Sequence, residues 1–345
     1  MYIAQTTQYI LPMRQDTQSV TIPNVSLLAG LRMRLKVIDY QDVRRDFDTG
    51  VPTKYNTNFH TKEDAPDLPI PSNKPYSFDR WLPLILRSRG LQPSALQIVS
   101  LTRTQVSVLN QAARASIHTR VLNRAYAEDL EDDVYPAFNQ LVFPPEGLFM
   151  RLGACSAKDG VQMTPGKASL HSVDEIVLLL STSQRAWGSL TNIMNSEASE
   201  AQIYFLPYDA RMKTEAEYRV FCMPESLRIT AVSQYRWHKP WVFSDRSGDE
   251  MSALAGEILK GIEDVLSDII GELQDEGEND LDDLLRTQGF TFDILYDEKT
   301  RLAALIELNT FGVRSACGSC LFQWVNDREL LYGNEPGGVE FRITM

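Results

Sequence analysis

Residues 289–312 limit the fold of this chain more than any other stretch, because they combine two apolar, β-prone segments with a polar turn between them. That pattern predicts a β-hairpin. Side chains two residues apart on a strand share a face, so Glu307 and Asn309 are expected to point the same way. Carboxylate and amide oxygens suit Mg²⁺ held together with substrate phosphates. Taken alone, the two residues favour a simpler interpretation, namely polar side chains where a strand ends.

The composition is that of a globular protein and excludes several functions. The 345 residues are enough for two or more lobes, and 43% hydrophobic and 23% charged residues are ordinary values. A net charge of −12 argues against general nucleic-acid binding, because phosphates would repel it. No apolar run approaches the roughly 20 residues of a membrane span, and the first residues lack the pattern of a secretory signal. We therefore expect a cytoplasmic protein with no nucleic-acid or membrane partner.

Cysteine and histidine are too scattered to predict a metal centre. Cys317 and Cys320 form a single CxxC pair, with no second pair and no paired histidines, whereas a zinc site normally has four ligands. We interpret the pair as structural or incidental. The sequence also lacks the HExxH, GxSxG and Walker A motifs. Any chemistry must therefore be carried by other residues.

The order of patterns divides the chain into three parts. Residues 1–75 are rich in Pro, Thr and Asn, and we expect them to form an N-terminal extension ending in a proline-rich connector. An N-terminal lobe is expected over residues 76–203 and a C-terminal lobe over residues 204–345. Helical spacing and hairpins are mixed instead of alternating strictly, which predicts an α+β fold with mostly antiparallel sheets.

Elements of the C-terminal lobe can be predicted individually. Residues 251–273 carry an apolar stripe at helical spacing and predict a core helix. Residues 217–222 alternate, so Glu217 and Arg219 share one strand face. We expect a further helix over residues 321–331 and a strand over residues 339–345.

Three segments contain residue types that suit a nucleotide, although each has a simpler explanation. Arg151 and Lys158 bracket small residues in a loop that could approach an anion, or the loop could be an ordinary surface turn. Arg219 on a strand could bind phosphate, or it could belong to a cross-strand Glu–Arg pair on a wet sheet face. The apolar segment 203–207 could line an adenine pocket, or it could simply end a strand.

Four blocks, taken in order, resemble one family. They are the segment 151–160, the strands 217–221 and 231–234, the hairpin parts 292–296 and 305–312, and the motif Leu-Phe-Gln-Trp at 321–324. Their order and spacing resemble the cell division cycle protein 123 family, a divergent branch of the ATP-grasp fold. The resemblance spans residues 78–342.

The resemblance implies two α+β lobes with ATP in a cleft between them and Mg²⁺ held by Asp293, Glu307 and Asn309. The residues that it places at the nucleotide are Arg151, Lys158, Tyr204, Phe205, Leu206, Pro207, Glu217, Arg219 and Gln234. Residues 204–207 would be the hinge beside adenine, and Lys158 and Arg219 would be the catalytic cations on the phosphates. Phosphoryl transfer depends mostly on positioning and charge neutralisation, so these residue types are the expected ones.

The sequence departs from the family pattern at several positions. Gly153 and Ala154 replace its Asn-Trp, residues 181–184 lack its lysine and acid, and Tyr235 stands where arginine is usual. Glu307 replaces its Asp, which gives the Glu-x-Asn pattern of the wider ATP-grasp ligases. These differences affect the expected partner more than the nucleotide site.

Two functions follow from the resemblance. One is an ATP-dependent ligase that activates a small-molecule or peptide carboxylate as an acyl phosphate for attack by an amine. The other is an assembly chaperone for the gamma subunit of eukaryotic translation initiation factor 2, as for eukaryotic members of the family. A nucleotide-binding remnant without catalysis is a third, simpler interpretation.

The expected metal site requires that Asp293 lie on the same face of the hairpin as Glu307 and Asn309. Cross-strand partners share a face. A regular hairpin with a four-residue loop would turn Asp293 away from the face of Glu307 and Asn309. We therefore predict an odd-length loop, or a β-bulge that restores the phase.

Overall fold

The computed structural model describes residues 32–335 and 337–345, which contain two β-sheets with helices packed against them. The expected two-sheet α+β fold is confirmed. The part of the N-terminal extension before Arg32, including the expectation about a secretory signal, lies outside the described residues. Within those residues, no helix combines the length and apolar character needed to cross a membrane.

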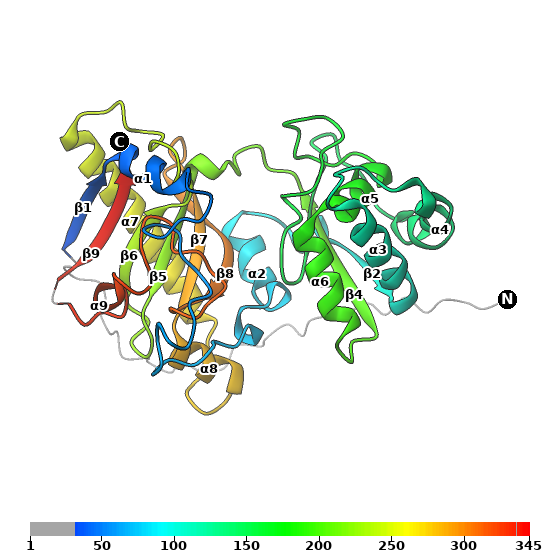
Figure 1. The fold of residues 1–345 in the computed structure, drawn as a ribbon. Helices are drawn as coiled ribbons and strands as arrows, with labels where there is room; N and C mark the ends of the chain where they lie inside the picture. Colours follow the sequence, from blue (N-terminus) through cyan, green and yellow to red (C-terminus); the bar gives the residue numbers. More distant parts are fainter. Residues whose placement is uncertain (1–31, 336) are drawn as a thin grey trace. The chain divides into compact units, whose positions relative to one another are not determined.

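The larger sheet has six strands, which Figure 1 shows side by side. In spatial order they are β1 (Met33–Ile38), β9 (Val339–Thr344), β6 (Ile229–Gln234), β5 (Glu217–Cys222), β7 (Phe290–Asp297) and β8 (Leu302–Thr310). β9 is parallel to both of its neighbours, and the other neighbours are antiparallel. The predicted C-terminal strand is thus an interior strand, and all six of its residues are buried.

The smaller sheet is entirely antiparallel, with β4 (Glu200–Pro207) between β2 (Gln97–Thr102) and β3 (Leu148–Leu152). One face packs into a core with α3 (Arg103–Ser116), α5 (Val173–Thr182) and α6 (Gln184–Met194). Across both sheets most strand pairs are antiparallel, as predicted. The expected lobe boundary between residues 203 and 204 falls inside β4, which belongs as a whole to this smaller sheet.

The other helices connect these sheets or cover their faces. They are α1 (Tyr40–Phe47), α2 (Phe78–Ser88), α4 (Ala127–Asp129), α7 (Gly248–Gly271), α8 (Asp280–Gln288) and α9 (Arg328–Leu331). Single helical turns occur at Lys74–Tyr76, Pro93–Ala95, Arg124–Tyr126, Leu130–Val134, Tyr135–Phe138 and Thr214–Ala216.

Helix α7 is the helix predicted over residues 251–273, and it packs against β1, β7 and β8 of the larger sheet. A capping box starts it: the Ser247 hydroxyl accepts a bond from the Glu250 amide, and the Glu250 carboxylate accepts one from the Ser247 amide. Ile258, Ile262 and Ile269 are fully buried on its inner stripe. The helix therefore covers one face of the sheet at these three strands.

The helix predicted over residues 321–331 is wrong for most of its length, because only Arg328–Leu331 is helical. Side chains hold the preceding residues in turns instead. The Gln323 side-chain oxygen accepts bonds from the amides of Val325 and Asn326, both at 2.6 Å. Arg342 on β9 donates to the Leu321 carbonyl at 3.0 Å and to Asp327 at 2.6 Å. These tertiary contacts outweigh the helical spacing of the apolar residues.

The described part of the expected N-terminal extension is joined to the larger sheet. Residues 33–38 supply its edge strand β1. Further on, the Asn56 amide donates to the Cys320 carbonyl at 2.6 Å and the Phe59 amide donates to the Ser315 carbonyl at 2.9 Å. This segment therefore packs on the loop that follows β8.

A close approach of α7 to β8 gives the first prediction. A methyl group on Gly261 would meet the Cβ atom of Ala303 at 2.9 Å, so Gly261→Ala is expected to lower the free energy of unfolding by about 1–3 kcal/mol. Gly256 on the same helix has no such neighbour within 4 Å, and Gly256→Ala should raise it by up to about 1 kcal/mol. Denaturant titration measures both. Equal effects would contradict the close approach, and adding Ala303→Gly to Gly261→Ala should recover part of the loss.

Candidate functional site

The candidate site is built on a row of polar residues that crosses the larger sheet. Arg219 on β5 stands opposite Asp293 on β7, and Asp293 stands opposite Glu307 on β8. In the other direction Arg219 is followed by Ser233 on β6 and Arg342 on β9. All five therefore lie on one face, opposite the face that α7 covers.

A β-bulge brings Glu307 into this row. Asp297 pairs with Leu302, which leaves a four-residue loop, and up to Ile294 the register would place Asp293 opposite Ile306. The register shifts between Asp293 and Ile294, so that Asp293 faces Glu307 instead. The predicted phase-restoring bulge is confirmed, and it is what lets Glu307 and Asn309 share the face of Asp293.

Arg219 and Asp293 form the most buried ion pair of the site. Nε and Nη2 of Arg219 donate to the two carboxylate oxygens at 2.8 and 2.7 Å, and Nη1 donates to the Gly318 carbonyl at 2.6 Å. Burial alone would lower the pKa of Arg219, but Asp293 outweighs it and raises that pKa well above its usual value. The guanidinium is thus held charged, with its planar fork fixed by a carboxylate and a carbonyl.

Glu307 forms an ion pair with Arg151, which comes from β3 of the smaller sheet. Burial favours the neutral acid, but Arg151 and Arg219 outweigh it and hold the pKa of Glu307 at about 2. The Arg151 guanidinium also lies 4.6 Å from the centroid of the Phe78 ring, which contacts the Tyr204 ring edge-on at 5.5 Å. Arg151 therefore connects the carboxylate row to the expected hinge strand β4.

Lys158 approaches the same row from the loop after β3. Its amine donates to the Tyr235 hydroxyl at 2.7 Å and lies 4.9 Å from the ring centroid, and Arg219 lies 5.0 Å from that centroid. The next residue fixes the loop: Asp159 accepts bonds from the Ser183 hydroxyl at 2.5 Å and the Gln184 amide at 2.9 Å, at the start of α6. Burial of the amine and the nearby Arg185 lower the pKa of Lys158.

These side chains border an open cavity of about 840 Å³, which is within the usual size range of ligand sites. Four expected site residues line it: Lys158, Arg219, Glu307 and Asn309. The other lining residues are Asn56, Asn58, Phe59, Arg185, Thr214, Tyr235, Arg236, Trp237, His238, Ala316, Cys317, Gly318 and Cys320.

The cavity wall has an excess of positive charge. Arg219 is paired with Asp293, Glu307 with Arg151, and Arg236 with Glu215. Within the described part of the chain, Lys158 and Arg185 form no ion pair, so two cations border the cavity without a carboxylate partner. An anionic ligand would neutralise them.

The remaining expected site residues lie outside the cavity wall. Asp293 lies behind Arg219, with both oxygens bonded to it. Tyr204 and Phe205 are paired on both sides within the smaller sheet, whereas Leu206 and Pro207 extend past the start of β2 and pair only with β3. The expected hinge thus keeps free backbone groups only at its end.

The side chain of Gln234 is hydrogen-bonded at both its nitrogen and its oxygen, whereas Glu217 is notable for its raised pKa. The Gln234 amide nitrogen donates to the Lys239 carbonyl at 2.7 Å, and its oxygen accepts from the Thr344 amide at 2.9 Å. Gln234 thereby fixes the turn that carries Tyr235, Trp237 and His238 to the cavity. Glu217 is half-buried at the start of β5, and burial followed by the nearby Asp293 raises its pKa to about 7.

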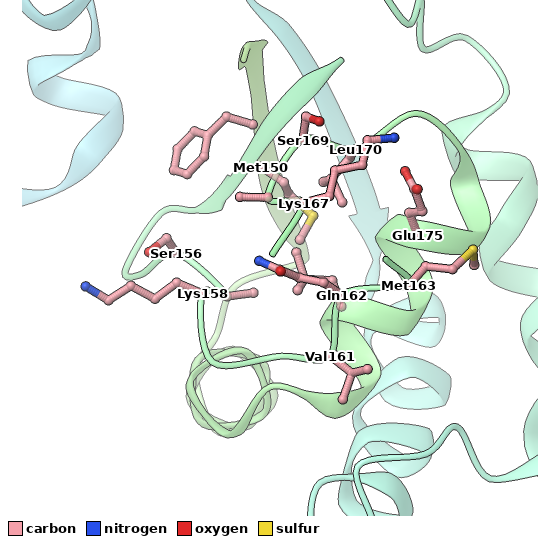
Figure 2. A pocket seen from close by; sticks show the side chains of 14 residues that line it. Met150, Ser156, Lys158, Val161, Gln162, Met163, Lys167, Ser169, Leu170 and Glu175 are labelled. Atoms are coloured by element: carbon pink, nitrogen blue, oxygen red, sulfur yellow. The ribbon is translucent and has the colours of Figure 1, made fainter. Parts of the chain in front are cut away.

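A second, smaller cavity of about 80 Å³ lies under the Lys158 loop. Met150, Leu170 and Leu179 form its apolar wall, with Gln162 and Glu175 at its edge. Figure 2 shows the Lys158 amine extending away from the Glu175 side of this cavity. The space is too small for a nucleotide, and it leaves the amine directed elsewhere.

The three residues expected to hold Mg²⁺ are arranged in a way that partly suits a metal site. Glu307 and Asn309 line the cavity, and the Asn309 amide nitrogen donates to Asp293 at 3.3 Å, so the three side chains converge. Both carboxylates are engaged by arginines, but an ionised carboxylate has about four acceptor positions and can bind a cation as well. No cluster of three or more His, Cys, Asp or Glu residues suited to a metal occurs in the described ranges.

Several cavity residues escaped the sequence analysis. Arg185 and Trp237 have no motif around them, and residues 56–59 were assigned to the N-terminal extension. Tyr235 was visible only as a departure from the family pattern. Cys317 and Cys320 line the cavity as free, buried thiols, and burial raises their pKa values to about 11 and about 12.

Comparison with known proteins tests the fold. No protein-family model and no curated protein matches the sequence. Among solved structures, Cdc123 from Schizosaccharomyces pombe has a TM-score of 0.51 at 19% identity, over 80% of this chain and 99% of that chain. Its C-terminally truncated form has a TM-score of 0.52 at 19% identity, over 83% of this chain and 99% of that chain. The chain has the fold of Cdc123.

The likeness to Cdc123 extends over at least 80% of this chain and over almost the whole of each Cdc123 structure. The α+β fold implied by the sequence blocks is thereby confirmed.

The raised pKa of Glu217 gives the second prediction. The folded protein binds the Glu217 proton more tightly than the unfolded chain does, so this stabilisation is complete below the ordinary glutamate pKa of 4.5 and is lost as the pH rises through about 7. The loss is a few kcal/mol at most, at about 1.4 kcal/mol per pKa unit. Glu217→Gln, which stays neutral, should flatten the pH dependence of the unfolding free energy between these values. An unchanged slope in the variant would contradict the assignment.

Proposed function

We propose that this chain is an ATP-grasp protein of the Cdc123 type that binds ATP with Mg²⁺ in the large cavity and acts as an ATP-dependent carboxylate–amine ligase. The observation that carries the proposal is the pair of cations, Lys158 and Arg185, that border the cavity without a carboxylate partner among the described residues. The wall of the same cavity also carries two oxygen ligands, Glu307 and Asn309. Cations for phosphates opposite oxygens for Mg²⁺ are the parts that phosphoryl transfer requires.

Each residue has a defined task in this proposal. Lys158 would leave Tyr235 to neutralise phosphate oxygens, while Asp159 keeps its loop on α6. Arg219 is already held by Asp293 and Gly318, so it would offer its charge without having to be ordered first. Glu307 and Asn309 would hold Mg²⁺, with Asp293 behind them. When bound, ATP with Mg²⁺ supplies the phosphoryl group that activates a carboxylate.

An assembly role is the second candidate. The family resemblance implies such a role, on the gamma subunit of translation initiation factor 2, for eukaryotic members, and the fold shared with Cdc123 supports it. In that role the cavity would bind nucleotide without turnover. The two candidates therefore share a nucleotide site and differ in whether a second substrate reacts there.

The third prediction tests the nucleotide site. Lys158→Ala is expected to weaken binding of Mg²⁺-ATP at least tenfold, because it removes one of the two unpaired cations. Lys167→Ala is the matched control, since it removes a lysine from the same segment that borders only the smaller cavity. Isothermal titration calorimetry measures both. Equal affinities in the two variants would contradict the site.

The fourth prediction separates the two candidate functions. Incubation with ATP, Mg²⁺ and a pool of amino acids is expected to release ADP and phosphate, and Asn309→Ala should abolish the release by removing a metal ligand. The ligase proposal fails if no turnover occurs while ATP still binds and the protein captures the gamma subunit of an initiation factor. Failure of ATP binding itself would overturn both candidates.

A further inference from the structure

The bulge in β8 leaves main-chain groups without partners in the sheet, and another part of the chain supplies those partners. β8 is an edge strand, so the outward main-chain groups of its residues have no neighbouring strand. A bulge also disturbs the pairing on the inner side. Main-chain groups near Ile306 therefore need partners from outside the sheet if the bulge is to persist.

The end of α2 supplies these partners. The Ser88 hydroxyl accepts a bond from the Leu305 amide at 3.0 Å, while its own hydrogen is donated to the Ile85 carbonyl at 3.0 Å. Nε of Arg89 donates to the Leu305 carbonyl at 3.1 Å, and Nη2 donates to the Ile306 carbonyl at 3.4 Å. Together the two side chains contact the extra residue of the bulge and the residue before it.

The polar contacts of the Arg89 side chain among the described residues are all with the main chain of β8. Among the residues that the structure describes, Arg89 forms no ion pair, and its two hydrogen bonds both go to main-chain carbonyls. Burial followed by the nearby Arg151 lowers its pKa to about 10, so the cation is held at a cost. A planar guanidinium can span two successive carbonyls, whereas a lysine amine is a single point of charge.

The face of the sheet on which Glu307 and Asn309 lie depends on the bulge that Ser88 and Arg89 contact. Without the bulge, the register between Ile294 and Leu305 would continue and place Ile306 opposite Asp293. A one-residue change of register moves every following side chain to the other face of the sheet. Glu307 would then point away from the cavity and from Arg151.

We propose that Ser88 and Arg89 form a clamp that holds the β8 bulge and so positions Glu307 and Asn309 on the metal-binding face. Arg89 is a positioning residue in this role, because it acts on the main chain and not on the ligand. Its contribution to metal binding rests on the proposed function, whereas its effect on the register of the hairpin does not.

The experiment compares Arg89→Ala with Arg87→Ala, an arginine two residues earlier that pairs with Glu272 on the surface. Mn²⁺ binding is measured by electron paramagnetic resonance, nucleotide binding is measured in EDTA, and the register is read from main-chain NOE contacts of residue 293. Arg89→Ala should weaken Mn²⁺ binding at least tenfold and lose the contacts between residues 293 and 307. Metal-free nucleotide binding should stay within twofold of the unmodified protein, and Arg87→Ala should change nothing.

Additional variants keep the outcome decisive. Arg89→Lys should give a Mn²⁺ affinity between those of Arg89→Ala and Arg87→Ala, because a single amine replaces the planar guanidinium. If Arg89→Ala does not fold, Ser88→Ala, which removes the acceptor for Leu305 together with the bond to Ile85 but keeps both Arg89 bonds, should give a smaller change in the same direction. Retained 293–307 contacts together with unchanged Mn²⁺ affinity overturn the clamp. If the unmodified protein binds no Mn²⁺, the proposed function fails, and the NOE contacts of the variants alone decide for or against the clamp.

Discussion

The two-point contact between Arg219 and Asp293 is the interaction on which the rest of the site depends. It places opposite charges next to each other at the centre of a sheet, where either one alone would be costly to bury. Arg219 in turn contacts Gly318 and the Tyr235 ring, so the loop after β8 and the turn after β6 are arranged around the same guanidinium. Both of these segments contribute residues to the cavity wall.

Much of this arrangement was predictable because it follows from strand periodicity. Alternation placed Glu217 and Arg219 on one face, and the requirement that Asp293 share the face of Glu307 led to the bulge. The apolar stripe of α7 gave that helix to within a few residues, whereas its capping box was found only in the structure. In each case the determining contacts are local, or follow from period two or 3.6.

The rest depends on contacts between segments far apart in sequence. Nothing near residues 321–327 indicates that Arg342, on the last strand of the chain, will bind Leu321 and Asp327 and hold the segment in turns instead of a helix. Likewise, the polar tail of α2 reads as a helix end, and its bonds to β8 cross more than 200 positions of sequence. The bond from the Thr344 amide to the Gln234 side chain is of the same kind. Residue spacing carries no information on such pairings.

Helix α2 has a mechanical consequence because its two ends contact different sheets. Phe78 at its start lies against Arg151 and Tyr204 of the smaller sheet, and Ser88 at its end bonds to the edge of the larger one. The helix between these contacts has eleven residues, with Pro83 in its interior, and is about 16 Å long. A ligand that displaces Arg151 would therefore disturb Phe78 at the start of α2 as well as the Glu307 carboxylate. The two sheets are thus connected in two ways, by the Arg151–Glu307 ion pair and by the two ends of α2, so a substitution in the middle of α2 is expected to affect the site without contacting it.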